Sequence, residues 1–482
     1  MGCIRVYIDW DSDLFDLIKG IKKRYLMKRI KEKCYNNSLF ICVLLLAASF
    51  MIIYISIASS NVPIMDYWKY INALVEKSYT GGVSFADLYS NNGVHRSPFQ
   101  LFIFLINVKV FHYNTQIAMY LGVVVSMINC IVFYKVVKKN ASNEKIANVM
   151  GILGVFFFFS LGAYEIIAQE FALALQIRVF GFLILYIYTD KLLKAWGETY
   201  DKKTSCLALY YLLVIDIFGG AFAISLSITV MMILLFDAIY KKIKGNRINI
   251  FNYIVLYISL FLGDFLYLYG LQVGGTVSTS VGISELIRYF FEGLFLVGGS
   301  SLFGTYNSHT VLMVLGMIVI CCHIICIVLY ISKKGYEKTY LPVFLYIYTF
   351  GFYCMIFLGR SGNGLEYLTS SRYIIDSLFA ILADILVLTC VLSQCNRKKK
   401  YSIALGSIMI LFFLVGIMKT DYEEVKRAPY RKQYDDNLIQ IMLHIDDYTD
   451  DELNLFQANS PEMVRSGVDI MKKYHLGVFY GR

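Results

Sequence analysis

The sequence predicts an all-α integral membrane protein with about eleven transmembrane helices and a small helical tail at the C-terminus. Of its 482 residues, 58% are hydrophobic and only 17% are charged, and the mean hydropathy is +0.59. A soluble domain of this size needs more charge to cover its surface. Apolar stretches of roughly 20 residues, enough to cross about 30 Å of hydrocarbon, recur along the chain. They are continuous rather than alternating, which argues against a membrane β-barrel.

These stretches divide the chain into three regions. A basic amphipathic segment, 1–38, precedes a transmembrane domain at 39–418, and the tail occupies 419–482. The predicted spans are 39–59, 116–136, 147–163, 168–189, 205–219, 221–239, 250–270, 309–332, 339–358, 373–394 and 401–418.

The basic residues predict the orientation, because Lys and Arg are retained in cytoplasmic loops. The first 38 residues are rich in lysine and arginine, and alternate turns repeat the signal at Lys138, Lys194, Lys241, Lys333 and Lys400. The N-terminus is therefore expected in the cytoplasm. With an odd number of spans, the tail is expected outside, together with the loops 60–115, 271–308 and 359–372.

Two shorter apolar stretches, 99–111 and about 287–304, lie within these external loops. Counting either one alone as a span would invert the charge pattern. We therefore predict that both lie in, or dip into, the outer leaflet.

Metal, disulfide and nucleic-acid functions find little support. Most cysteines fall inside apolar runs, and Cys321, Cys322 and Cys326 beside His323 lack the paired spacing of a zinc site. We interpret them as small apolar side chains in packing. The formal charge of +10 follows membrane topology and does not indicate a nucleic-acid surface.

Under this topology the unusual polar residues collect on the external side. The first loop carries Asp66, His95 and Arg96, the turn after span three carries Glu165 and Gln169, and the late loop carries Arg360, Arg372 and Tyr373. A partly buried carboxylate has raised proton affinity and suits a general base. Arginine presents a planar, permanently charged fork that matches phosphate oxygens. Together these groups are what sugar transfer from a polyprenyl-phosphate donor requires.

Structural roles are open for several of the same residues. Arg360 and Arg372 could snorkel to the interface or pair with Glu366. Asp66 could cap a helix, and His95 could be an ordinary loop hydrogen-bonder. Arg178, near the middle of span four, is expected to pair with a carboxylate between helices, and Asp384 is one candidate partner.

Short motifs at these positions resemble the polytopic GT-C glycosyltransferase-like proteins of bacterial envelopes. Asp66 matches their acidic residue soon after span one, and the segment from Asn92 to Arg96 approximates an Asn-x-His-Arg element. The turn with Tyr164, Glu165, Gln169 and Gln176 is similar to their glutamine- and glutamate-containing turn. Arg360-Ser361-Gly362 and Ser371-Arg372-Tyr373 resemble their late arginine–glycine and Ser-Arg-Tyr elements.

The resemblance implies inverting sugar transfer at the external face of the bacterial plasma membrane. The donor would be a polyprenyl-phosphate sugar and the acceptor an envelope glycan or lipid. Asp66, His95 and Glu165 would be catalytic, and Arg96, Arg360, Arg372, Tyr373 and Gln169 would bind the lipid phosphate or sugar. No cofactor is implied, and no DxD or acidic pair beside Asp66 supports a divalent metal.

Two other functions remain open on the sequence: a transporter or flippase of lipid-linked saccharide, and a non-catalytic subunit of polysaccharide assembly. A transporter should place key groups near mid-depth, and Arg178, Asp216 and Asp384 keep this alternative open.

The tail carries its own helix signals. Thr449 and Glu452 form a capping-box pattern, Ser460-Pro461 predicts an N-cap followed by proline at the first helical position, and Gly477 follows the basic end of that helix. These helices could form a lid or acceptor platform over the external opening, or a small stabilising cap.

Overall fold

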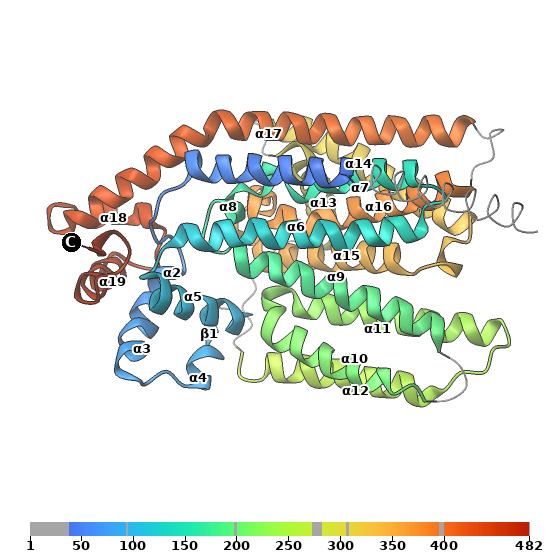
Figure 1. Cartoon of the computed structure of the whole chain (residues 1–482), viewed down its shortest axis with the longest axis horizontal. Coiled ribbons are helices and arrows are strands. Elements are labelled where there is room, and N and C mark those ends of the chain that lie inside the picture. Colours follow the sequence, from blue (N-terminus) through green and yellow to red (C-terminus); the bar gives the residue numbers. More distant parts are fainter. Residues whose placement is uncertain are drawn as a thin grey trace, which may run out of the picture.

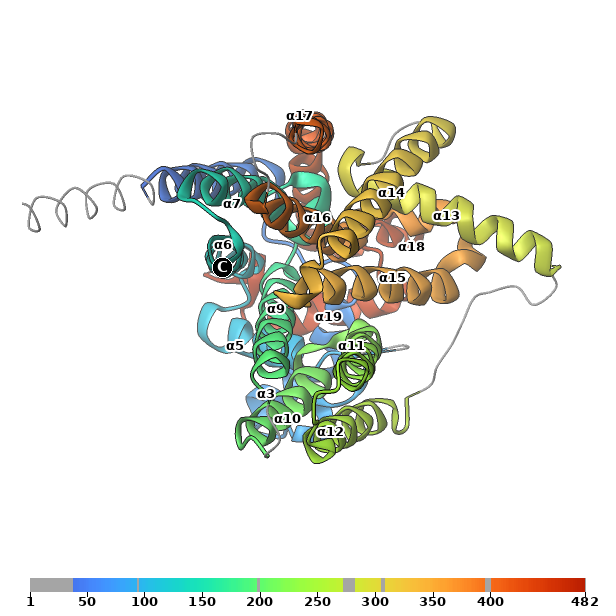
Figure 2. The same cartoon turned by 90° about the vertical axis from the view of Figure 1, so that its right-hand side faces the viewer.

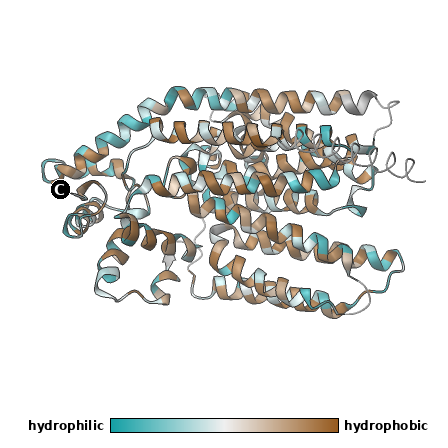
Figure 3. Ribbon diagram, in the orientation of Figure 1, coloured by the Kyte–Doolittle hydropathy of each residue, from teal (hydrophilic) through white to brown (hydrophobic). Residues whose placement is uncertain are grey.

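The computed structural model describes residues 38–92, 95–196, 200–271, 282–304, 308–394 and 400–481, so the amphipathic segment predicted for 1–38 lies outside them except for Ser38. Within these ranges, eleven helices are long and apolar enough to cross a membrane. Figure 1 shows most of them side by side along the long axis, and Figure 3 shows hydrophobic residues dominating their length. The predicted all-α, multi-pass membrane fold is confirmed.

The bundle begins with a helix at Ser38–Ala58. The other long elements are α6 (Thr115–Asn140), α7 (Glu144–Phe158), α9 (Ala172–Ala195), α10 (Lys203–Leu213), α11 (Ala223–Ile243), α12 (Ile250–Leu268), α13 (Ile283–Phe303), α14 (His309–Ser332), α15 (Leu341–Arg360), α16 (Ile374–Gln394) and α17 (Lys400–Leu443). Short elements join them: η2 (Leu161–Ala163), α8 (Tyr164–Ile167), η3 (Val214–Phe218), η4 (Gly220–Phe222), η5 (Gly335–Glu337), η6 (Ser361–Asn363), η7 (Leu365–Thr369) and η8 (Ser371–Tyr373).

The predicted and observed sets of long apolar helices differ at two stretches: one predicted span is broken, and one stretch predicted not to span forms a long helix. The stretch 205–219 is split into α10 and the π-helix η3, so it forms no single α-helix of spanning length. The stretch 287–304 belongs instead to α13, whose 21 residues pass the length and composition test. Hydropathy reports apolar length, not where the backbone hydrogen-bond pattern changes, so the sequence missed the break.

The direction of α13 bears on its predicted interfacial position. Its closest short neighbours are η7 and η2, which lie near the ends of α15 and α7, and it also contacts α17. Viewed down the bundle in Figure 2, α13 appears lengthwise whereas α17 appears end-on. Because α13 also packs along α14 and α16 and is long and apolar enough to span, its place in the outer leaflet stays a prediction.

Small residues bring α13 and α14 into close contact. A Cβ on Gly316 would lie 1.7 Å from the carbonyl oxygen of Phe295, and one on Gly299 would lie 2.2 Å from that of Leu312. Apolar helices in lipid gain little from hydrophobic burial against each other, so van der Waals contact at such short range is a main source of association.

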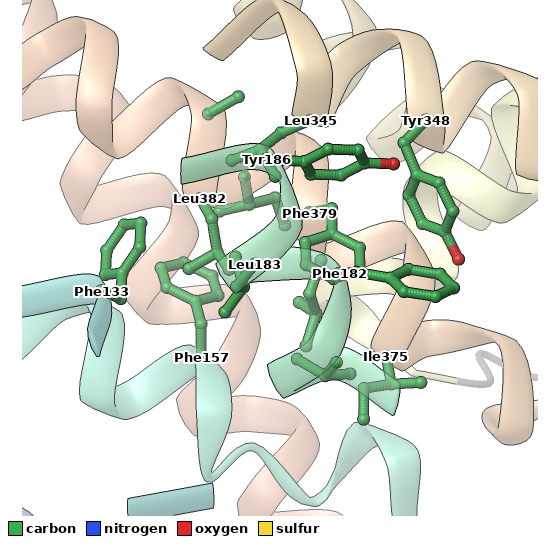
Figure 4. Close-up of a cluster of buried hydrophobic side chains, with 14 of the residues drawn as sticks. Phe133, Phe157, Phe182, Leu183, Tyr186, Leu345, Tyr348, Ile375, Phe379 and Leu382 are labelled. Carbon is green, nitrogen blue, oxygen red and sulfur yellow. The ribbon is translucent and has the colours of Figure 1, made fainter. Parts of the chain in front are cut away.

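Aromatic packing fills the centre of the bundle. Figure 4 shows rings from α6, α7, α9, α15 and α16 in one buried cluster. Tyr186 stacks on Phe344 with ring centroids 4.9 Å apart, and Phe182 meets Tyr348 edge-on at 5.4 Å. Such pairs contribute roughly 0.5–1.5 kcal/mol beyond their buried area.

A second hydrophobic core lies at one end of the bundle. It joins the first loop to the tail. The sequence analysis had treated these two parts of the chain as separate regions. The loop elements are α2 (Tyr67–Tyr70), η1 (Ile71–Val75), α3 (Glu76–Thr80), α4 (Phe85–Leu88), the paired strands β1 (Asn91–Asn92) and β2 (His95–Arg96), and α5 (Pro98–Phe111). The tail elements are η9 (Ile445–Asp447), α18 (Asp450–Leu453), η10 (Asn454–Phe456), α19 (Pro461–Lys473) and η11 (Gly477–Phe479). Buried Trp68 connects the two, meeting Phe456 edge-on at 5.1 Å.

The helix α17 carries the chain from one core to the other without a break. Its 44 residues run past the boundary predicted at 418, with Pro429 inside the helix. Beyond the apolar part it is fixed to the end of the first helix, since the Ser60 amide donates to Asp435 Oδ2 (2.9 Å) and the Ser60 hydroxyl donates to Asp436 Oδ1 (2.5 Å).

The two predicted helix starts in the tail are confirmed. Thr449 and Glu452 form a capping box at the start of α18. Ser460 accepts from the Met463 amide at 3.3 Å, with Pro461 opening α19. The expectation that Gly477 ends α19 is wrong: the left-handed residue after the C-cap Tyr474 is His475 (φ 51°), and Gly477, with φ 58°, opens η11.

The lysine-rich turns and the tail occupy opposite ends of the bundle (Figure 1). At the end that we call the lysine-rich end, Lys241 pairs with Asp237 (2.9 Å) and donates to the Leu193 carbonyl (2.6 Å), while Lys194 donates to the Tyr336 carbonyl (2.5 Å). We call the opposite end, with the second core, the tail end.

Candidate functional site

Four polar residues at the tail end form what we call the Asp66 cluster: Asp66, Lys69, His95 and Arg360. Asp66 follows Met65, whose φ is +59°, and the Met65 amide donates to the Phe456 carbonyl of the tail (3.0 Å). The helix α2 begins after Asp66, yet no side-chain capping bond forms, so the capping role considered for Asp66 is wrong.

The electrostatics of His95 connect the members of this cluster. Burial lowers the pKa of His95; Asp66 opposes that effect, and the Arg360 and Lys69 cations reinforce it. The imidazole is therefore held toward its neutral form, in which one ring nitrogen can accept a proton. Lys69 was missed from the sequence, because one lysine in an external loop carries no distinguishing pattern.

A second group, the Glu165 cluster, consists of Glu165, Ser370, Ser371 and Arg372. Glu165 Oε2 accepts from the Ser370 hydroxyl (3.0 Å) and the Arg372 amide (3.2 Å), and it lies 3.7 Å from Arg372 Nε. Arg372 Nε donates to Ser370 Oγ at 2.9 Å, while the Glu165 amide donates to Ser371 Oγ at 3.3 Å. Sequence reasoning placed Glu165 and Arg372 on one side, and the structure brings them into contact.

A small apolar cavity, with space for only one or two water molecules, lies next to the Glu165 cluster, inside the bundle. Its lining comes from η2, α8, α7, α9 and α16 and includes Ala163 and Ile375, which are two and three residues from Glu165 and Arg372. Figure 4 shows Phe157, Ile375, Phe379 and Leu382 of this lining. Arg372 keeps 44% of its side chain exposed, so its guanidinium remains accessible beside the apolar space.

Arg96 does not belong to either cluster. Its guanidinium donates to the carbonyls of Leu266 and Tyr267, both at 3.0 Å, and to that of Tyr269. These are the last carbonyls of α12, which lack partners within the helix. Arg96 is buried and lies over the Tyr89 ring at 4.7 Å. The prediction that Arg96 binds phosphate is therefore replaced by a role in capping α12.

Two further predicted residues lie beside the clusters. Tyr373 continues from Arg372 in η8 and meets the Phe352 ring at 6.1 Å, which is a packing contact. Gln169 lines a second, smaller cavity at the tail end, next to Glu170 and Asp435.

Glu170 is a buried carboxyl group just before α9. It is 4% exposed and accepts from Tyr113 Oη (2.8 Å) and Asn107 Nδ2 (3.2 Å). Burial raises its pKa to about 8, and the two hydrogen bonds only partly oppose that shift. The sequence showed Glu170 in the turn, but nothing in it distinguished a buried carboxylate from an exposed one.

The ionisable groups deep in the bundle are paired with each other. Arg178 pairs with Asp376, not with the candidate Asp384. Asp384 instead accepts from Tyr346 Oη (2.5 Å) and lies 2.6 Å from His323 Nδ1. The expectation of a carboxylate partner for Arg178 is confirmed, and the choice of Asp384 is wrong. No cluster of three or more metal-ligating side chains occurs among the residues that the structure describes.

Comparison with known proteins adds no relative: no family model, no curated protein and no solved structure matches this chain.

Proposed function

We propose that this protein is a membrane glycosyltransferase that moves a sugar from a polyprenyl-phosphate donor to a glycan or lipid acceptor. The observation that carries the proposal is the position of Arg372, an accessible arginine beside a small apolar cavity in the bundle. A polyprenyl phosphate has the matching shape, a charged head on a long apolar chain. Arginine recognises the phosphate, and the apolar side chains beside it contact the first part of the lipid chain.

The tail end would face the outside of a bacterial plasma membrane. Support comes from the lysine-rich turns, which gather at the opposite end and are retained in the cytoplasm under the positive-inside rule. The polyprenyl-linked sugar would then be used at the external face.

The chemistry assigns one role to each group. The Asp66 carboxylate takes the proton from the acceptor hydroxyl. At the same time the oxygen of that hydroxyl forms a bond to the anomeric carbon of the donor sugar. The bond between that carbon and the phosphate oxygen breaks, and the lipid phosphate leaves with the electron pair. Attack from the side opposite the leaving group inverts the anomeric centre.

The cations stabilise the departing phosphate. Arg372 is held in place by Glu165 and Ser370, and Arg360 adds positive charge within the Asp66 cluster. Glu165, expected to be catalytic, is better placed to position Arg372, because its Oε2 accepts from the loop that carries that arginine. Neutral His95 can orient Asp66 or accept a proton from it.

Transport of a lipid-linked saccharide has less support. A transporter should hold functional charges near mid-depth. Here Arg178 pairs with Asp376 and Asp384 pairs with His323, both within the bundle. A non-catalytic assembly subunit would leave the arrangement of Asp66, Arg360 and Arg372 without a role.

The test is a transfer assay with the purified chain in lipid nanodiscs and a panel of polyprenyl-phosphate sugars. We expect Asp66→Asn to lower the rate by about 100-fold or more, as for loss of a general base. Arg372→Ala should lower it by about 10–100-fold through loss of phosphate binding. Arg288→Ala is the matched control, because Arg288 is 61% exposed on α13 and pairs with Glu285 and Glu292 of its own helix. Full activity in both site variants would overturn the assignment.

Orientation is measured separately by cysteine labelling. A cysteine in place of exposed Gln440, compared with the unmodified chain, should react with an impermeant reagent added outside intact cells. Reaction only after the cytoplasmic side is opened would reverse the orientation.

A further inference from the structure

The helix α17 is longer than a membrane is thick. Its 44 residues, Lys400–Leu443, rise about 66 Å in total, whereas the hydrocarbon core of a bilayer measures about 30 Å. No charged residue lies between Lys400 and Lys419, and this uncharged stretch rises about 27 Å. The uncharged stretch therefore fills the hydrocarbon core, and α17 leaves the core close to Lys419.

One face of α17 is exposed. The helix runs along the edge of the bundle in both views (Figure 1 and Figure 2), and its apolar part is 33% buried, compared with 94% for that of α16. Leu411, Val415 and Met418 are exposed on this face, at the three- and four-residue spacing of one helical stripe. Large apolar side chains in this position face lipid.

The same stripe changes character where the uncharged stretch ends. Its next members are Tyr422, Lys426 and Tyr430, and the two tyrosines are 59% and 73% exposed. Lys426 is exposed as well, and its ammonium nitrogen lies 4.3 Å from the centre of the Tyr422 ring. Exposed Gln433 and Asn437 continue the stripe beyond them. Tyrosine and lysine are the side chains found between hydrocarbon and water, because each has an apolar body and a polar tip.

The direction of these side chains suits a contact with headgroups. Helical side chains lean toward the N-terminus of their helix, which for α17 is the direction of the hydrocarbon core. Tyr430 and Lys426 therefore reach back toward the membrane from backbone positions that lie farther out.

The charge of this segment favours an anionic partner. Between 419 and 433 the basic residues outnumber the acidic ones by five to three: Lys419, Lys426, Arg427, Arg431 and Lys432 against Asp421, Glu423 and Glu424. Two of the acids face protein, since Asp421 Oδ1 accepts from the Leu161 amide (2.7 Å) and buried Glu424 pairs with arginines of its own helix. Partly exposed Glu423 offsets one of the positive charges, so the outer side of the segment stays net positive.

An exposed tyrosine marks a similar level on a second helix. α12 begins at Ile250, in the turn that follows the lysine-rich end of α11, and Tyr269 caps it after a rise of about 29 Å. Tyr269 is 71% exposed. On α17 the rise from Lys400 to Tyr422 is about 33 Å. Two helices that start at the lysine-rich end thus reach an exposed tyrosine after nearly the same distance, which fits one leaflet surface crossing both.

We propose that the face of α17 formed by Tyr422, Lys426 and Tyr430 binds the phosphate groups of anionic phospholipids in the leaflet at the tail end. The ammonium group of Lys426 meets the phosphate, the tyrosine hydroxyls donate to the headgroup, and the apolar stripe below contacts the acyl chains. The inference rests on the membrane fold and not on the proposed sugar transfer.

The same level passes through the Glu165 cluster. Leu161, which is bonded to Asp421, lies four residues before Glu165, and the Arg431 guanidinium lies over the Tyr164 ring at 3.3 Å. Lipid binding at this face of α17 would therefore hold the Glu165 cluster at the depth of the lipid phosphates.

The first test measures depth with a tryptophan reporter at three positions of the exposed stripe, Val415→Trp, Tyr422→Trp and Asn437→Trp. The purified full chain is placed in nanodiscs of phospholipid brominated on its acyl chains, and the signal of the unmodified chain, which has three tryptophans, is subtracted. Fluorescence quenching should be strong at 415, weaker at 422 and absent at 437. Quenching at 437 as strong as at 415, or none at 422, would overturn the proposal.

The second test measures lipid preference in the Tyr422→Trp background. The nanodiscs contain equal parts of phosphatidylglycerol and phosphatidylcholine, and one of the two lipids is brominated at a time. Brominated phosphatidylglycerol should quench more strongly. Lys426→Gln should lower the preference for phosphatidylglycerol derived from this ratio by about fivefold, the effect of one lysine at an anionic surface.

The matched control is Lys473→Gln, because Lys473 is an exposed lysine of α19 that pairs with Glu76. It should leave the preference unchanged. The proposal is overturned if the two lipids quench the reporter equally, or if Lys426→Gln, shown to be folded by its melting curve, keeps the full preference. An equal loss in Lys473→Gln would also overturn it, because the preference would then follow the overall charge of the chain.

Discussion

Arg178 Nη2 lies 2.6 Å from Asp376 Oδ2, in an ion pair that joins α9 to α16 inside the bundle. Tyr348 Oη donates to the other carboxylate oxygen at 2.5 Å, and the guanidinium lies over the Phe222 ring at 4.8 Å. Four helices or helix ends therefore converge on one neutralised charge pair. Removing water from two charges costs several kcal/mol per ion, so the pair is stable only while it is complete.

This pair predicts an asymmetry between single and double substitutions. Asp376→Ala leaves the Arg178 cation buried without its partner and should destabilise the fold by roughly 3–5 kcal/mol. Replacing both residues by apolar ones, Arg178→Met with Asp376→Leu, should cost far less. Equilibrium unfolding in detergent measures both. A double variant as unstable as the single one would contradict a role based on charge neutralisation.

Contact between α13 and α14 depends on glycine at one position. Gly316→Ala places a methyl group 1.7 Å from the Phe295 carbonyl oxygen, so the helices must separate, at a cost of about 1–3 kcal/mol or more. Gly359→Ala in α15 is the control, since no atom lies within 4 Å of its added Cβ. That change should be neutral or slightly stabilising, because alanine favours the helix. Melting temperatures of the two variants decide the comparison.

The capping role of Arg96 predicts a local effect. Arg96→Ala frees the last carbonyls of α12, and the loss of charged hydrogen bonds should cost about 1.5–3 kcal/mol. Hydrogen exchange of the amides near 264–269 should accelerate while α9 and α16 stay protected. If exchange in α12 is unchanged and donor affinity falls instead, Arg96 contacts substrate after all.

Glu170 predicts a pH dependence of stability. Its pKa is raised to about 8 in the folded chain from an ordinary 4.5, so the folded state binds a proton that the unfolded state releases. The stabilising contribution of Glu170 to the free energy of unfolding is present in full below about pH 4.5 and is lost as pH rises toward 8. Glu170→Gln should remove this component and leave the variant more stable than the unmodified chain above pH 8, by at least about 1 kcal/mol. Identical slopes of stability against pH in the two chains would contradict the assignment.

Composition and charge placement were sufficient to predict the fold class. Each span must satisfy its backbone internally and bury apolar side chains in lipid, so its signal is local in the sequence. The capping-box pattern of Thr449 and Glu452 in the tail is also local in the sequence, so it could be predicted for the same reason.

Pairings between distant residues could not be predicted in the same way. Arg178 and Asp376 are 198 positions apart, and Asp384 was an equally reasonable partner until the rotation of α16 was known. The capping of α12 by Arg96 and the buried state of Glu170 depend on how the first loop folds back on the bundle. The types of side chain identified the end of the molecule where the candidate site residues gather. Tertiary packing decided which of those residues contact each other.

The second core has a consequence for the order in which the chain is made. Trp68 and Phe104 leave the ribosome long before Phe456, Val464 and Val468, which belong to the same core and follow every intervening helix. The loop must therefore wait, with apolar side chains uncovered, until every intervening helix has been inserted. Closure of this core therefore requires that the intervening helices have been inserted, and a chain ending before α19 would leave these apolar side chains exposed to membrane quality-control proteases.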